Sequence, residues 1–189
     1  MIAGLEIDSE TITHAQRGDL KAFDALVDDC YPLIYSSAYR MLNNEDDACD
    51  ATQEAFVRAY GSIHTFRRDA SFSTWLYRIA MNVCLDRLRR RGRERDSLRL
   101  LSDTADDDSV RDIPDERNDP QAEAVKAQRQ ALVQESLAGL TSEHRAVIVL
   151  YDLQGLSYEE IGAVLAVPVG TVKSRLNRAR LALRTRLEP

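Results

Sequence analysis

Near the C-terminus the sequence reads Gly155-Leu156-Ser157-Tyr158-Glu159-Glu160-Ile161-Gly162-Ala163-Val164-Leu165-Ala166-Val167-Pro168-Val169-Gly170-Thr171-Val172-Lys173. Ser157, followed three residues later by Glu160, forms a capping box that starts a helix. Residues 166–170 form a tight turn, and Pro168 is well placed near the start of a second helix that runs to about Leu187. The pattern predicts a helix-turn-helix.

The second of these helices has an apolar side and a polar side. One narrow sector, which should face the core, holds Val172, Leu176, Ala179 and Leu183. The opposite side holds Lys173, Ser174, Asn177 and Arg178, and Arg180 and Arg184 follow farther along. Such side chains near the N-terminal end of a recognition helix can bond base edges, and the later arginines suit phosphates. We therefore predict that this half binds duplex DNA; the alternative is a helical hairpin with a solubilising basic rim.

The charge of the chain is divided into blocks. The 189 residues carry a net charge of −6, which by itself argues against a nucleic-acid ligand. Residues 1–60 carry −8 and residues 102–123 carry −7, whereas residues 61–101 carry +6 and residues 161–189 carry +5. Any anion that the chain binds must therefore meet one of the two basic blocks.

Apolar residues recur at helical spacing throughout, without convincing alternation of period two, so we predict an all-α fold. Helices are predicted within residues 11–43, with breaks at Gly18-Asp19 and Tyr31-Pro32, and then over about 45–60 and 73–93. The helix over 45–60 should bury Ala48, Ala51, Ala55, Phe56 and Ala59.

Residues 101–122 differ in composition from the rest of the chain. They are crowded with aspartates and contain Pro114 and Pro120, so they cannot bury enough apolar surface to offset the entropy of ordering. We predict a flexible acidic linker here. The chain would then consist of two small helical domains, residues 1–100 and 123–189, on a mobile tether.

The segment 66–78 interleaves four aromatic residues with basic ones. Single-stranded nucleic acid favours this combination, because cations meet phosphates and ring faces meet unstacked bases. The alternative is that the rings belong to the core, which we expect for Trp75 and leave open for Phe66 and Phe72. By itself the segment is a weak signal.

Other classes of function find little support. No apolar run approaches the roughly 18 residues of a membrane helix, and the N-terminus lacks the pattern of a signal peptide. Cys30, Cys49 and Cys84 form no CxxC pair and the three histidines lie far apart, so we predict reduced structural thiols, no metal and no cofactor. We interpret the chain as a cytoplasmic protein without membrane insertion, and not as an enzyme.

Three motifs in order resemble the extracytoplasmic-function group of bacterial sigma factors, the minimal two-domain members of the sigma-70 family. The first is Asp47-Ala48-Cys49-Asp50-Ala51-Thr52-Gln53-Glu54-Ala55-Phe56-Val57-Arg58-Ala59-Tyr60. The second is Phe66-Arg67, then Phe72-Ser73-Thr74-Trp75-Leu76-Tyr77-Arg78-Ile79-Ala80-Met81-Asn82, then Asp86 and Arg89-Arg90. The third is Leu156-Ser157-Tyr158-Glu159-Glu160-Ile161 with Pro168-Val169-Gly170-Thr171-Val172-Lys173-Ser174-Arg175. The resemblance extends from about Thr11 to Leu187, with the acidic linker matching in position only.

The resemblance implies a sigma2-like domain and a sigma4-like domain that contact core RNA polymerase and both promoter elements. Residues that match the contacts with the clamp helices of the polymerase largest subunit are Asp47, Asp50, Gln53, Glu54 and Phe56. Residues 67–74 match a loop that receives a base flipped from the −10 element. The −10 set as a whole is Phe66, Arg67, Arg68, Phe72, Ser73, Asn82, Arg87, Arg89 and Arg90. Residues that match the −35 contacts are Arg145, Thr171, Lys173, Ser174, Asn177 and Arg178, with Arg145 on a phosphate.

The resemblance also implies further partners: the polymerase flap region, and an anti-sigma factor that covers the binding surfaces. Two other functions remain as alternatives. A free-standing helix-turn-helix regulator would explain residues 143–189, but not the acidic helix or residues 66–91. An enzyme acting on nucleic acid would need clustered carboxylates at a basic cleft or a metal set, and the only dense run of carboxylates lies in the linker.

Overall fold

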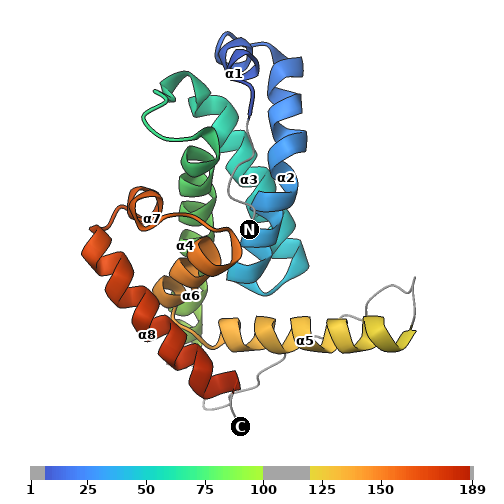
Figure 1. Cartoon of the computed structure of the whole chain (residues 1–189), viewed down its shortest axis with the longest axis vertical. Helices are drawn as coiled ribbons and strands as arrows, with labels where there is room; N and C mark the ends of the chain where they lie inside the picture. The colour runs from blue at the N-terminus through green and yellow to red at the C-terminus, as the bar shows by residue number, and fades with distance from the viewer. Residues whose placement is uncertain (1–6, 100–119, 188–189) are drawn as a thin grey trace.

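The computed structural model describes residues 7–99 and 120–187, and these residues form helices and turns without any strand. The first half contains α1 (Ser9–Gln16), α2 (Leu20–Leu42), α3 (Glu45–Ser62), the 3-10 turn η1 (Ile63–Thr65) and α4 (Phe72–Arg99). The second half contains α5 (Pro120–Ala138), α6 (Ser142–Ile148), the π-helical turn η2 (Val149–Leu153), α7 (Tyr158–Leu165) and α8 (Val169–Leu187) (Figure 1). The all-α prediction is confirmed.

Most of the predicted linker lies outside the described residues, which resume at Pro120. The last three residues assigned to the linker, 120–122, form the first turn of α5. Within the described parts of the chain, no helix is both long and apolar enough to cross a membrane.

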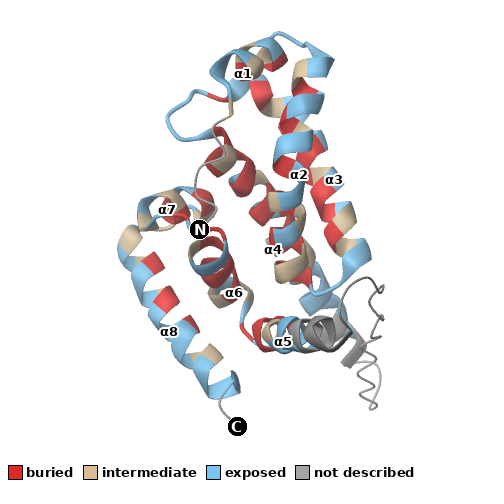
Figure 2. Ribbon diagram, turned by 45° about the vertical axis from the view of Figure 1, so that its right-hand side comes forward, coloured by how far each residue is buried: buried red, intermediate tan, exposed pale blue. Residues whose placement is uncertain are grey.

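In the first half, α3 packs against both α2 and α4, and its buried side is a stripe of small residues. Ala48, Ala55 and Ala59 are completely buried, as their spacing predicted. The Asn44 side chain caps α3 by accepting a hydrogen bond from the backbone N–H of Asp47, at 2.9 Å. Figure 2 shows the buried positions of α3 in red, beside α2.

The helix boundaries near the N-terminus agree with the sequence in one place and differ in another. Gly18, with φ +92°, separates α1 from α2, and Asp19 caps α2 by accepting from the backbone N–H of Lys21 at 3.0 Å. The predicted break at Tyr31-Pro32 is wrong, because α2 continues through Pro32. A proline inside a helix removes one hydrogen bond. Here the neighbouring side chains Cys30 and Ile34 are almost fully buried, so packing holds the helix together.

The helix-turn-helix is confirmed in detail. The Ser157 N–H donates to Glu160 Oε2 at 2.8 Å, and the Ser157 hydroxyl accepts from the Glu160 N–H, so both halves of the capping box are present. Ala166 ends α7 with φ +54°. A Cβ on Gly162 would lie 3.0 Å from the Val167 carbonyl oxygen, which explains a glycine at this close approach. The apolar stripe of α8 is buried at Val172, Leu176 and Ala179.

The two halves pack against each other, an arrangement that a mobile tether did not predict. Helix α7 lies beside α4, and α5 crosses the end of α2 (Figures 1 and 2). The Tyr77 hydroxyl on α4 donates to Gln154 Oε1 at 2.9 Å, and both side chains are buried. The Gln134 amide on α5 donates to the Tyr39 carbonyl of α2 at 2.8 Å. The junction is therefore closed by specific polar contacts.

Candidate polymerase and nucleic-acid interfaces

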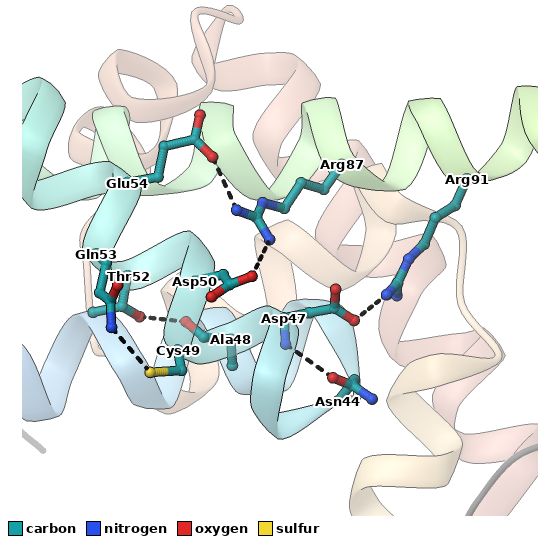
Figure 3. Close-up of polar contacts among 10 residues, drawn as sticks. All are labelled: Asn44, Asp47, Ala48, Cys49, Asp50, Thr52, Gln53, Glu54, Arg87 and Arg91. Atoms are coloured by element: carbon teal, nitrogen blue, oxygen red, sulfur yellow. Dashed lines mark hydrogen bonds and ion pairs between the residues drawn. The ribbon is translucent and has the colours of Figure 1, made fainter.

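Two arginines on α4 face the acidic side of α3 (Figure 3). Arg87 donates to Glu54 Oε2 at 3.0 Å and lies 3.8 Å from Asp50 Oδ2, and Arg91 pairs with Asp47. The hydrogen bond from Arg87 is the main reason why the pKa of Glu54 lies below its ordinary value. The acidic residues matched to polymerase therefore form an ion-pair seam with α4, the helix that carries much of the −10 set.

The seam changes the interpretation of several charged residues. The Arg87 side chain is only 22% exposed and is engaged by carboxylates, so it is not poised to meet a phosphate as the sequence suggested. Asp50 remains 68% exposed, and Gln53 also faces solvent. Arg89 and Arg90 are exposed, and the Arg89 guanidinium lies 3.1 Å from Asp86 Oδ1.

Phe56 is not available on the surface of α3. Its ring is 8% exposed and lies parallel to that of Tyr31, with centroids 6.2 Å apart. The next residue, Val57, is 72% exposed, and Tyr60 one turn on is 44% exposed. Sequence reasoning missed this pair, although Val57 is apolar and out of phase with the buried alanines, which is the signal that could have identified it.

A cavity of about 270 Å³ lies where the −10 loop was predicted. Its walls include Phe66 and Trp75, with Arg67 and Arg78 among the polar lining residues. The rings of Phe66, Phe72 and Trp75 form a buried cluster with centroids 5.5–5.6 Å apart. Phe66 and Phe72, whose burial the sequence left open, therefore belong to the core with Trp75, and Phe66 and Trp75 also form part of the cavity wall.

The loop before α4 is anchored to α1 on one side. Arg68, with φ +60°, donates to the Ser9 carbonyl at 2.9 Å and to the Thr13 hydroxyl at 2.6 Å, so its guanidinium anchors the loop to α1. The Ser73 hydroxyl is 2.9 Å from that of Ser71. Asn82 is exposed on α4, one turn beyond Arg78.

Helix α7 from the second half reaches the same cavity. Ala163 is one of its lining residues, and the Thr74 hydroxyl donates to Glu160 Oε1 at 3.2 Å. Burial alone would raise the pKa of Glu160, but hydrogen bonds from Ser157 and Thr74 hold that pKa below its ordinary value. In this arrangement the cavity is therefore covered on one side by the helix-turn-helix.

The predicted −35 residues of α8 share one outer surface. Lys173, Ser174, Asn177 and Arg178 are exposed, and Thr171 is half-buried, with its carbonyl accepting from the Ser174 hydroxyl at 3.0 Å. Arg180, which the sequence suggested for phosphates, is held by an ion pair with Asp152. The hydrogen bond to Asp152 raises the pKa of Arg180 further.

Arg145 differs most from its predicted place at a phosphate. It is 6% exposed and donates to the carbonyls of Met41, Ala138 and Leu140, while its Nε has no hydrogen-bond partner. Burial lowers the pKa of this guanidinium. A buried cation that meets only carbonyl dipoles keeps much of its desolvation cost, so in this arrangement Arg145 is a junction residue and not a surface contact.

Two of the three cysteines, Cys30 and Cys84, are buried, as expected for structural thiols, whereas Cys49 is only partly buried. Burial raises the pKa of both Cys30 and Cys84 to about 12, which keeps them protonated. Within residues 7–99 and 120–187, no group of acidic, histidine and cysteine side chains is arranged to hold a metal ion.

Comparisons with known proteins show the family. The family model of sigma-70 region 2 matches residues 26–94, and that of sigma-70 region 4 matches residues 130–183. The RNA polymerase sigma-H factor of Pseudomonas aeruginosa is 36% identical, over 97% of this chain and 95% of its own. The ECF RNA polymerase sigma factor SigW of Bacillus subtilis is 39% identical, over 93% of this chain and 94% of its own.

Two solved structures have a similar fold. One is CnrH in complex with the cytosolic domain of CnrY, with a TM-score of 0.66 and 28% identity over 95% of this chain and 96% of that chain. The other is the sigma factor RpoE of Bartonella quintana in complex with the anti-sigma factor NepR, with a TM-score of 0.69 and 26% identity over 89% of this chain and 98% of that chain. From its two matched regions, its relatives and its fold, the chain belongs to the extracytoplasmic-function group of the sigma-70 family.

Proposed function

We propose that this sigma factor uses three surfaces: the outer side of α3 for core RNA polymerase, the cavity beside Phe66 and Trp75 for an unpaired −10 base, and the outer side of α8 for the −35 duplex. The ion-pair seam between α3 and α4 carries the proposal. Because the seam fixes the two helices to each other, docking of α3 on polymerase also places the cavity of α4 relative to the promoter.

Strand opening would be driven by binding free energy. Extracting a base from the stack costs a few kcal/mol, which contacts in the cavity must offset. The cavity supplies an apolar wall from Phe66 and Trp75, together with the cations of Arg67 and Arg78 for the adjoining backbone. We expect no nucleotide cofactor and no catalytic step; the factor would act in the cytoplasm, where its polymerase is.

The closed arrangement must open before these surfaces can act together. Ala163 lies at the cavity, and Arg145 is turned into the junction with α2. We therefore expect the domains, proposed as residues 1–100 and 123–189, to separate when core polymerase binds. An anti-sigma factor would keep the surfaces covered, since the two similar structures include CnrH with CnrY and RpoE with NepR.

Run-off transcription tests this function. Purified bacterial core polymerase, with and without the chain, is given a library of promoter fragments, and the transcribed fragments are sequenced. Transcription from specific start sites that depends on the chain is expected. If no fragment is transcribed and the chain does not co-migrate with core polymerase, the alternative of a free-standing DNA-binding regulator gains support.

Val57→Asp is expected to weaken binding to core polymerase about tenfold, because a charge replaces an exposed valine on the docking side. Its stability should change by no more than about 0.5 kcal/mol. The neighbouring variant Phe56→Ala provides the contrast, because it removes a buried ring. It should lower the free energy of unfolding by about 3–5 kcal/mol. Fluorescence anisotropy with core polymerase and urea unfolding measure the two effects. Unchanged polymerase affinity in Val57→Asp would remove this side of α3 from the docking surface.

Arg178→Ala is expected to reduce binding to the −35 element by about 1–3 kcal/mol, the range for one good side-chain contact with a base pair. Binding to core polymerase should not change, because Arg178 is exposed on α8 and far in sequence from α3. Holoenzyme binding to promoter duplexes with intact and scrambled −35 elements separates the two. Equal loss on both duplexes would identify Arg178 as a phosphate contact instead.

A further inference from the structure

At the edge of its core, the helix-turn-helix carries two stacked tyrosines with a cation beside each ring. The ring of Tyr151, on η2, lies parallel to that of Tyr158, on α7, with centroids 4.9 Å apart and planes 10° apart. Arg180 Cζ lies over the Tyr151 ring, 5.1 Å from its centroid, and Lys173 Nζ lies over the Tyr158 ring, 5.4 Å from its centroid. We call these four residues the cation–tyrosine ladder.

Neighbouring groups fix the positions of Arg180 and Tyr158 in the ladder. At one end Asp152 binds Arg180 through two oxygens, one of them 3.2 Å from Arg180 Nε. Near the other end Tyr158 is the first residue of α7, directly after the N-cap Ser157 and inside the capping box that Ser157 forms with Glu160, so its backbone position is set. Both tyrosines are only half-buried, and neither belongs to the fully buried apolar core of α6, α7 and α8.

The free end of the ladder is Lys173, on the outer side of α8 with Ser174, Asn177 and Arg178. A lysine is a flexible point charge that loses rotamer freedom whenever it makes a directed contact. A ring face attracts the ammonium and restricts those rotamers before any ligand arrives. Contact with a base edge would then cost less ordering entropy than it would for an unrestrained lysine.

We propose that Tyr158 is a positioning residue for base recognition, holding Lys173 in the orientation with which it meets one base pair of the −35 element. The inference rests on the proposed function, in which α8 reads that element. Tyr158 itself need not touch DNA. Its effect passes through Lys173 and therefore concerns the sequence preference at a single base pair, while affinity for DNA in general stays the same.

The test uses holoenzyme assembled from the full chain and core polymerase. Promoter duplexes are randomised over the −35 element, and the bound fraction is sequenced to give the base preference at each position. Lys173→Ala identifies the base pair that Lys173 reads. Tyr158→Leu should weaken the preference at that same base pair by about two- to fivefold and leave the other positions unchanged. Tyr158→Phe keeps the ring face and should retain the preference.

A double variant separates positioning from a structural role. In the Lys173→Ala background, Tyr158→Leu should have no further effect on base preference. The proposal is overturned if Tyr158→Leu lowers binding equally for all sequences, or if its effect persists without Lys173. If Lys173→Ala itself changes no preference, the assigned role of Lys173 in the proposed function has failed, which is a different result.

Discussion

Replacing Trp75 with alanine is expected to lower the free energy of unfolding by about 3–5 kcal/mol, the range for removing a buried large aromatic side chain. Trp75 is 8% exposed and lies 5.5 Å from both Phe66 and Phe72, centroid to centroid. A small domain has about 5–15 kcal/mol of stability in total, so the loss is a large fraction. Because Trp75 is the only tryptophan, unfolding in urea should be followed by circular dichroism and not by its fluorescence.

The same substitution removes a wall of the cavity and should abolish promoter opening, measured by permanganate reactivity of unpaired thymines. Trp75→Phe is the matched control, since it keeps an aromatic ring in the cluster and should retain most of the stability. Arg78→Ala tests the cavity separately: it should reduce opening while leaving stability almost unchanged, because Arg78 is exposed. Normal opening by folded Trp75→Ala would show that the cavity is not where the base binds. A stability loss below about 1 kcal/mol would show that the ring cluster is not a core.

Tyr77→Phe is expected to open the junction between the two halves. The variant leaves the buried Gln154 oxygen without its donor, at a cost of about 1–3 kcal/mol. Only the closed arrangement bears this cost, because Gln154 is hydrated once the halves separate. The equilibrium should therefore shift toward the open form by about 5- to 150-fold. The affinity of the free chain for promoter duplex should rise by up to the same factor, since only the open form exposes Arg145.

Small-angle X-ray scattering measures the opening and a duplex titration measures the affinity. Arg145→Ala provides the sharpest comparison: it also breaks the junction, but it removes the proposed phosphate contact, so the chain should open without a gain in affinity. Tyr60→Phe, which removes a hydroxyl from an exposed tyrosine on α3, should change neither quantity. If Tyr77→Phe expands the chain but binds duplex no better, the closed arrangement does not hold back DNA binding.

Much of the candidate site could be predicted from the sequence because it depends on neighbours within one or two turns. The outward positions of Lys173, Asn177 and Arg178 follow from the buried positions of Val172, Leu176 and Ala179 on the same helix. The capping box of Ser157 and Glu160 is likewise a local arrangement. The order of the three motifs then made the family identifiable. The family also accounts for the acidic helix, which DNA binding could not explain.

Side chains at helix–helix contacts were predicted less well. Phe56 was assigned both to the buried stripe of α3 and to the polymerase contacts, and the structure keeps it in the stripe, where its ring lies parallel to that of Tyr31 on α2. The sequence suggested that Arg87 contacts a phosphate, but in the fold its guanidinium lies 3.0 Å from the Glu54 carboxylate of α3. Pro32 suggested a helix break, but α2 continues through it because the packing of neighbouring side chains outweighs the lost hydrogen bond.

The sequence by itself determined most of the helices and their buried sides, the helix-turn-helix and the family. Only the tertiary structure decided which charges are free: Arg87 is bound by α3, Arg145 by the end of α2, and Arg180 by Asp152. The physical reason is the separation along the chain over which each effect acts. Capping and periodicity act between residues a few positions apart, whereas the solvation and pairing of a charge depend on whichever distant segment packs beside it.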